Sequence, residues 1–192
     1  DPTATKDSPL VAAVLARLKD LEAAGYQYEG AEASLDLLVR KAAGRYRAFF
    51  ELGHYRTIGE QPALDRGRCA QATVLVFVDG ERELQAAEGD GPVHALDLAL
   101  RRSLERFYPS LSGMRLTDYK VRVLDRGTAT AARVRVLIES TDKDGSWTTV
   151  GVSGDIIEAS WIALVDSIEY KLIKDLPGRE APVESERSTV WA

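Results

Sequence analysis

The feature that most constrains the fold is a pattern that occurs twice: a glycine-containing loop followed by a long amphipathic helix. The two copies cover Gly89–Tyr108 and Gly151–Leu172. Residue types recur between them at one offset of 64 positions, as from Ala95 to Ala159. The other matches at this offset are Ala99 with Ala163, Leu100 with Leu164, Ser103 with Ser167, and Tyr55 with Tyr119. The sequence therefore predicts two related units, and the repeat is firmest in the helices.

Three segments with strand-like patterns precede each of these helices. They are residues 49–58, 69–78 and 81–87 in the first unit, and 116–124, 131–141 and 146–152 in the second. Most are rich in β-branched and aromatic residues, and Asp79–Gly80 is typical of a hairpin turn. A three-stranded antiparallel sheet has one face to cover, and one helix per unit can cover it. The predicted fold class is α+β, with two pseudo-symmetric βββα units.

A two-helix segment is predicted ahead of the two units. Ser8–Pro9 suits a helix start, apolar residues follow at helical spacing, and Gly25 ends that helix. A second helix is expected over 31–43. We expect the end of a helical subdomain over 1–45, a domain of two units over 46–175, and a flexible polar tail over 176–192.

Composition limits the kinds of partner. The 192 residues carry a net charge of −5, which argues against nucleic acid or an anionic membrane as the main partner. No apolar run approaches the ~20 residues needed to span a bilayer, and the first residues do not resemble a secretory signal. The single cysteine, Cys69, cannot form an internal disulfide, so a reducing, cytoplasmic location is expected. Because the chain begins at Asp1, we expect it to be part of a longer protein.

Each long helix carries an apolar stripe and a row of small residues beside it. The stripes, which we expect to face the sheets, are Val93, Leu96, Leu100, Leu104 and Phe107, and Ile157, Trp161, Leu164, Ile168 and Leu172. The rows are Ala95, Ala99 and Ser103, and Ala159, Ala163 and Ser167. Alanine is also the best helix former, so propensity alone is an alternative explanation. The matching serines favour a packing surface between the two units or between subunits.

The two loop–helix junctions are the strongest candidates for a binding site. Free N–H groups and the helix dipole at the GDGPV loop, 89–93, suit a carboxylate, although a plain connection is commoner. Asp155 suits an ammonium group, although its simpler role is an N-cap. Together the junctions could clamp both ends of a free amino acid. His94 could line such a cleft or be an exposed residue of the first helical turn.

Nothing in the sequence indicates a catalytic site. His54 and His94 have no cysteine or carboxylate at metal-ligand spacing, and Cys69 is better explained by packing than by nucleophilic chemistry. No serine–histidine–aspartate set, metal set or paired carboxylates stand out. A stand-alone enzyme is therefore the interpretation that fits worst.

The order of these motifs resembles the C-terminal part of citramalate synthases, within the 2-isopropylmalate synthase family. The likeness covers about residues 10–174, and its most specific motif is Gly151–Val152, Asp155–Ile157 and Ala159–Ser160. The segment GYQYEGAEAS, 25–34, favours the citramalate branch. In the family, a (β/α)8 barrel with a divalent metal joins the acetyl group of acetyl-CoA to a 2-oxo acid. The resemblance implies that this chain lacks that barrel, holds no metal or cofactor, and is inactive as a synthase by itself.

The family's regulatory domain dimerises and binds the end-product amino acid. For the citramalate branch the resemblance implies isoleucine as feedback effector and a homodimer, with the barrel of the same protein as a further partner. Carried over by position, the effector-binding residues are Gly89, Asp90, Gly91, Pro92, Val93, His94, Ala95, Gly151, Gly154, Asp155, Ile156 and Ile157. Val93, Leu96, Ile156 and Ile157 are expected to form the apolar wall. Two alternatives remain open: a leucine-sensing domain of a 2-isopropylmalate synthase, and a dimerisation module that binds no effector.

Overall fold

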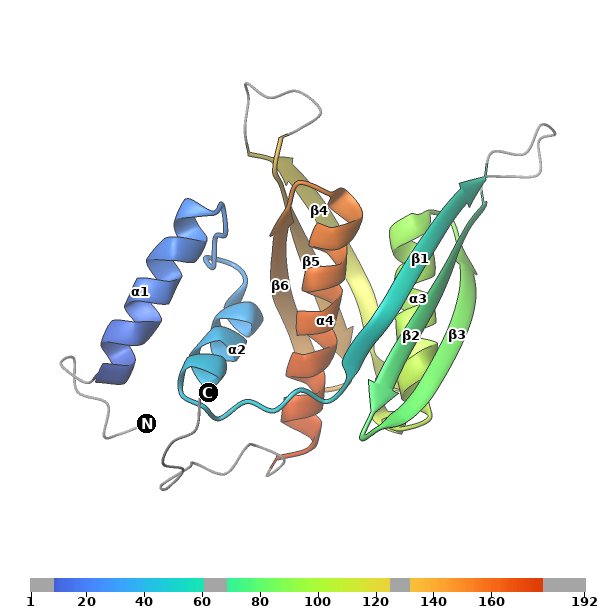
Figure 1. Ribbon diagram of the computed structural model, residues 1–192, viewed down its shortest axis with the longest axis horizontal. Coiled ribbons are helices and arrows are strands. Elements are labelled where there is room, and N and C mark those ends of the chain that lie inside the picture. Colours follow the sequence, from blue (N-terminus) through green and yellow to red (C-terminus); the bar gives the residue numbers. More distant parts are fainter. Residues whose placement is uncertain (1–8, 61–68, 125–131, 178–192) are drawn as a thin grey trace, which may run out of the picture.

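The structure, a computed structural model, describes residues 9–60, 69–124 and 132–177 (Figure 1). Residues 178–192 of the predicted tail (176–192) and the predicted helix start at Ser8 lie outside the described residues. Two helices come first, α1 (Pro9–Ala23) and α2 (Glu32–Ala42). As predicted, Gly25 terminates this helix: it lies just after the last residue of α1, with a φ of 103° that favours glycine.

Two βββα units follow, as the repeat predicts. The first contains β1 (Glu51–Glu60), β2 (Cys69–Val78), β3 (Glu81–Gly89) and α3 (Pro92–Glu105). A short 3-10 helix, η1 (Pro109–Gly113), leads to the second unit, which contains β4 (Arg115–Val123), β5 (Val134–Asp142), β6 (Gly145–Ser153) and α4 (Ile156–Asp175). The strands form two separate antiparallel sheets, in the orders β1-β2-β3 and β4-β5-β6. The predicted α+β class is confirmed.

The repeat extends through the strands at the same offset of 64 positions. β3 spans 81–89 and β6 spans 145–153. The ladder of the first unit is irregular between Leu52 and His54, and that of the second between Leu116 and Asp118. The correspondence between units therefore holds residue by residue, although the strand sequences match less clearly than the helices.

The first strand starts two residues later than predicted. The backbone N–H of Phe49 donates to the side chain of Glu169 on α4 (3.1 Å), and the Phe49 carbonyl accepts from the Tyr108 hydroxyl (2.7 Å). These bonds hold Phe49 in the connection between α2 and β1. The Phe49 ring packs into the hydrophobic core, while its backbone does not pair with β2.

The rows of small residues face the sheet of their own unit, not another unit or subunit as expected. A side chain at Gly151 of β6 would collide with the backbone of Ala159 and Ala163, because α4 lies directly on the strand. In the same way, Gly89 of β3 leaves room for the backbone of Ala95 on α3. Small residues on both sides let helix and sheet approach closely, which packs the core densely.

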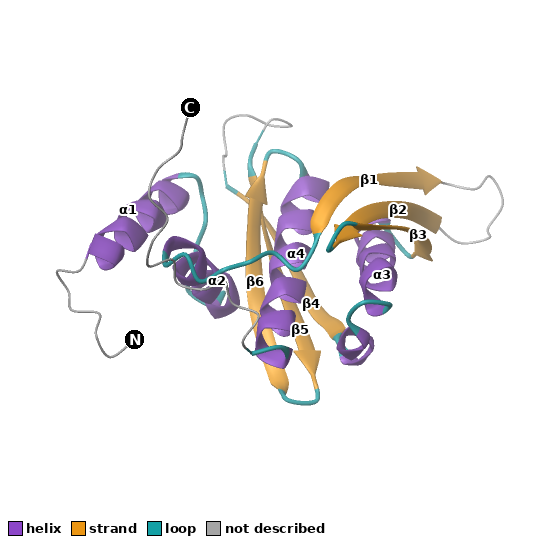
Figure 2. Ribbon diagram, turned by 60° about the horizontal axis from the view of Figure 1, so that its bottom comes forward, coloured by secondary structure: helices purple, strands orange, loops and turns teal. Residues whose placement is uncertain are grey.

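Part of the apolar stripe of α4 faces the other unit instead of its own sheet. Trp161 stacks on Tyr55 of β1, with ring centroids 4.9 Å apart and planes at 26°. Figure 2 shows α4 between the β4–β6 sheet and β1. On another side α4 contacts α2, where Ser34 donates to Asp166 (2.8 Å). Its neighbours on these sides make α4 the central helix of the molecule.

Candidate functional site

The two units meet at two corners that the repeat relates to each other. At one corner, α4 meets β1 and Trp161 stacks on Tyr55. The residues 64 positions away from this pair are Asp97 on α3 and Tyr119 on β4. At this second corner there is no indole, and Asp97 and Tyr119 both line a cavity of about 420 Å³. The first corner is thus filled by an aromatic pair. The second contains this cavity, which we call the open corner cavity.

Two elements contribute the lining of the open corner cavity. The residues are Val93, His94, Asp97 and Arg101 of α3, and Arg115, Leu116 and Tyr119 of β4. Val93 and His94 lie three or four positions before Asp97, and Arg101 lies four after it, so all four project from one side of that helix. The lining therefore combines a carboxylate and two guanidinium groups with apolar and aromatic surface.

Asp97 and Arg101 form the charged centre of the open corner cavity. The two Asp97 oxygens accept from Nε (3.0 Å) and a terminal nitrogen (2.7 Å) of Arg101. The side chains are 4% and 16% exposed, so water screens this pair weakly. Another Arg101 nitrogen donates to the Met114 carbonyl (2.9 Å), which fixes the guanidinium beside β4. Two-point pairs of this kind position charged groups well for recognition.

Tyr119 connects the open corner cavity with the first turn of α4. Its hydroxyl lies 2.9 Å from the Ser160 hydroxyl, and Ser160 donates to the Ile156 carbonyl (2.6 Å). A ligand that displaces the Tyr119 ring would therefore act directly on the helix that contacts β1, β6 and α2.

The first predicted junction only partly lines the cavity. Val93 and His94 do so, whereas Leu96 is completely buried. Gly91 is the N-cap of α3 without a capping side chain, so the first N–H groups of the helix stay available. The Asp90 N–H donates to Nδ1 of His94 (3.2 Å), which orients the imidazole.

The second predicted junction lies outside the open corner cavity. Asp155 caps α4 by accepting from the Ile157 N–H (2.7 Å), which is its simpler predicted role. Gly151 is needed for helix packing, and Ile156 is 43% exposed on the surface. The hypothesis that the two junctions together clamp an amino acid therefore stays a prediction.

Sequence reasoning missed the polar residues at the centre of the cavity. Asp97, Arg101 and Arg115 belong to no motif, and an aspartate four positions before an arginine on a helix usually marks an exposed ion pair. One signal was present: Asp97 is the counterpart of Trp161, so a small charged residue stands where the other helix has its largest apolar one. Among the described residues, the lining has no serine, threonine or cysteine. The cavity therefore presents charged, aromatic and apolar groups that can bind a ligand, but no serine, threonine or cysteine that could act as a nucleophile.

None of the helices that the structure describes is long and apolar enough to cross a membrane.

Residues 29–172 match the family described as the LeuA allosteric (dimerisation) domain. The (R)-citramalate synthase of Geobacter sulfurreducens is 52% identical over 166 residues, which are 86% of this chain and 31% of that protein. The (R)-citramalate synthase of Synechocystis sp. is 51% identical over 173 residues, covering 87% and 31%.

More distant similarity reaches the isopropylmalate branch. A probable 2-isopropylmalate synthase of Methanopyrus kandleri is 36% identical over 98 residues, which are 50% of this chain and 19% of that protein. The chain spans about a third of the length of the citramalate synthases that it matches. The domain match covers both βββα units. The chain therefore belongs to the LeuA allosteric (dimerisation) domain family, the regulatory part of citramalate and 2-isopropylmalate synthases.

Proposed function

We propose that this chain is the effector-sensing, dimerising part of a citramalate synthase and binds free isoleucine in the open corner cavity. The observation that carries the proposal is the Asp97–Arg101 pair between apolar walls, at the corner where Asp97 stands in the position equivalent to Trp161. A free amino acid needs both charge signs and an apolar surface. The volume of about 420 Å³ lies in the usual range for small-molecule sites.

The residues suggest how the effector is held. The ammonium group faces Asp97, whose oxygens keep lone pairs beside the bonds from Arg101. The carboxylate faces Arg115 and the free N–H groups at the start of α3. The aliphatic side chain lies on Val93, Leu116 and Tyr119. Binding then favours one arrangement of the domain, with a coupling free energy of typically ~1–3 kcal/mol.

The properties of the longer protein belong to the same proposal. It condenses acetyl-CoA with pyruvate in a barrel that holds a divalent metal, works in the cytoplasm as a homodimer, and supplies isoleucine biosynthesis. The similarity to (R)-citramalate synthases over 86% of this chain supports this assignment. The second candidate, a leucine-sensing isopropylmalate synthase, is supported by a shorter match of 98 residues at 36% identity.

Titration calorimetry with isoleucine and leucine tests the proposal. We expect isoleucine to bind more tightly than leucine, and Asp97→Asn to weaken binding at least tenfold because the amide is uncharged. Asp144→Asn, an exposed change in the turn between β5 and β6, is the matched control and should bind normally. Tighter binding of leucine would reassign the branch. If neither amino acid binds and neither raises the melting temperature, while sedimentation shows a dimer, the domain is a purely structural dimerisation module.

A further inference from the structure

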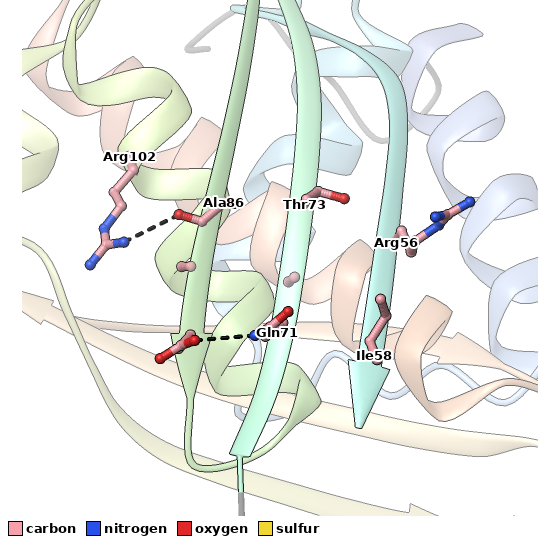
Figure 3. Close-up of a pocket in the computed structure, with 9 residues that line it drawn as sticks. Arg56, Ile58, Gln71, Thr73, Ala86 and Arg102 are labelled. Atoms are coloured by element: carbon pink, nitrogen blue, oxygen red, sulfur yellow. Dashed lines mark hydrogen bonds between the residues drawn. The ribbon is translucent and has the colours of Figure 1, made fainter. Parts of the chain in front are cut away.

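A second cavity lies on the first unit, where it extends across the three strands of the sheet and reaches the free edge of β3. It has a volume of about 570 Å³ (Figure 3). We call its lining the β3 edge surface: Arg56, Ile58, Gln71, Ala72, Thr73, Ala86, Ala87, Glu88 and Arg102. These residues come from all three strands and from α3. In Figure 3, Arg102 reaches Ala86 from one side, while Arg56 and Ile58 lie on β1 at the other side.

The corresponding surface of the second unit is covered by the helix α2. The Ser34 hydroxyl accepts from the backbone N–H of Val150 on β6 (3.0 Å) and donates to Asp166 on α4 (2.8 Å). The turn before α2 adds a further bond, in which Arg135 of β5 donates to the Gly25 carbonyl (2.7 Å). Ala33 and Leu37 of α2 are buried by this packing. The edge of β6 is thus a binding surface for a helix.

The offset of 64 positions maps this helix-binding surface onto the β3 edge surface. Val150 corresponds to Ala86, Asp166 to Arg102, and Arg135 to Gln71. All three counterparts line the cavity. The first unit therefore presents, without a helix on it among the described residues, the surface that the second unit uses to hold α2.

The chemistry of the two surfaces is inverted. In the second unit Asp166 is an acceptor, and Ser34 bridges it to a backbone N–H. In the first unit Arg102 is a donor, bonded to the Ala86 carbonyl (3.2 Å). In an antiparallel ladder the N–H and carbonyl of one residue point the same way, so the Ala86 N–H also points toward the free edge. The Arg102 guanidinium and the Ala86 N–H are therefore two donors beside each other, so a partner at this place must supply an acceptor. A carboxylate is the acceptor that best matches a guanidinium.

The edge favours a helix over an added strand. Arg102 crosses the edge to reach the Ala86 carbonyl (3.2 Å), while Arg106 binds Glu81 (2.8 Å) and Glu83 (3.1 Å) on the face of β3 that carries α3. Charged side chains across an edge prevent pairing with another strand. The acidic residue of the surface, Glu88, is engaged by the Gln71 amide (3.1 Å), whereas Arg56 adds a second exposed cation.

We propose that the β3 edge surface is a docking site for an amphipathic helix that carries a carboxylate at its centre. The carboxylate takes the place that Ser34 has against the second unit and accepts from Arg102 and the Ala86 N–H. Its small apolar residues pack against β3 and α3, in the way that α2 packs against β6 and α4. Arg56 favours further acidic residues at the rim of such a helix.

The test uses a peptide of residues 29–44 with Ser34→Glu, which keeps the docking face of α2 and supplies the carboxylate. In an NMR titration of the full chain we expect saturable shifts of Thr73, Ala86 and Gln71. Arg102→Glu should weaken binding at least tenfold, and a Ser34→Lys peptide should restore it. Arg82→Glu is the matched control, because Arg82 is an exposed residue of β3 outside the cavity. This variant should bind the first peptide normally.

Four results of the peptide titration would overturn the proposal, and one result without peptide would do so as well. These are no saturable shifts, shifts confined to the second unit, equal binding by the Arg102→Glu variant, or the same shifts from inorganic phosphate alone. The last result would mark an anion site and not a helix site. If the shifts appear without peptide as protein concentration rises, the occupant is a second copy and the proposed occupant is wrong. Arg102 is exposed, so loss of folding is not expected, and the circular dichroism spectrum of each variant checks this.

Discussion

The helices α3 and α4 occupy equivalent places in the two units but have different surroundings. α4 contacts its own sheet, the first unit through Trp161, and the N-terminal segment through Asp166 and Glu169. At the same three positions α3 has Asp97, Arg102 and Glu105. Asp97 and Arg102 line cavities, and Glu105 is partly exposed. The two equivalent helices thus differ in role: α4 is a packing element between its neighbours, whereas α3 lies beside two candidate binding surfaces.

The largest expected effect comes from emptying the closed corner. Trp161→Ala removes a side chain that is 8% exposed and stacked on Tyr55, which should cost about 3–5 kcal/mol of the free energy of unfolding. Urea unfolding measures this. Asp97→Ala at the open corner is the counterpart and should cost clearly less. Equal costs would mean that the two corners do not differ in their contribution to stability.

The pH dependence of stability should distinguish Glu169 from its counterpart Glu105. Burial raises the pKa of Glu169 to about 7, although the Phe49 N–H, Lys41 and Tyr46 favour the charged form. The folded state therefore binds this proton more tightly than the unfolded chain does. The stabilisation is complete below the unfolded pKa of about 4.3 and is lost as pH rises through about 7.

Glu169→Gln checks this effect, because the amide keeps the shape and cannot ionise. Relative to the unmodified chain, the variant should gain up to about 3 kcal/mol between pH 5 and pH 8.5. Thermal unfolding at both pH values gives the difference. Glu105→Gln, at the partly exposed equivalent position of α3, is the matched control. A pH dependence of stability that is the same with and without Glu169 would contradict the explanation.

The contact between α2 and the second unit should have an intermediate effect. Ser34→Ala removes the hydroxyl that links the Val150 N–H to the Asp166 carboxylate. Each of these two poorly solvated groups then loses one hydrogen-bond partner. The expected cost is about 1–3 kcal/mol. Hydrogen exchange at the Val150 amide should rise in the variant. Ser112→Ala, at an exposed hydroxyl on η1, is the control and should leave both quantities nearly unchanged.

The smallest expected effect concerns the cap of α4. Asp155→Ala removes the bond to the Ile157 N–H and should cost about 1 kcal/mol. Because Asp155 lies outside the open corner cavity, isoleucine affinity measured by calorimetry should not change. A large loss of affinity would restore the original hypothesis that Asp155 receives the ammonium group of the effector.

Much of the fold could be predicted because local patterns and the repeat agree. Asp79–Gly80 sets the hairpin between β2 and β3, and the matched alanines identify the two helices. The offset then assigns equivalent strands. The candidate site was harder to predict, because Val93 and His94 belong to a motif but Asp97, Arg115 and Tyr119 do not. They are brought together only when α3 of one unit meets β4 of the next.

The sequence by itself determined the α+β class, the two βββα units and the family resemblance, because periodicity, turn residues and motif order are properties of the chain. Only the tertiary structure decided which faces are covered. It showed that the small-residue rows lie on their own sheets, that Trp161 closes one corner, and that Asp97 leaves the other open. The physical reason is that burial depends on which elements meet in space, and the same helical pattern is compatible with several neighbours.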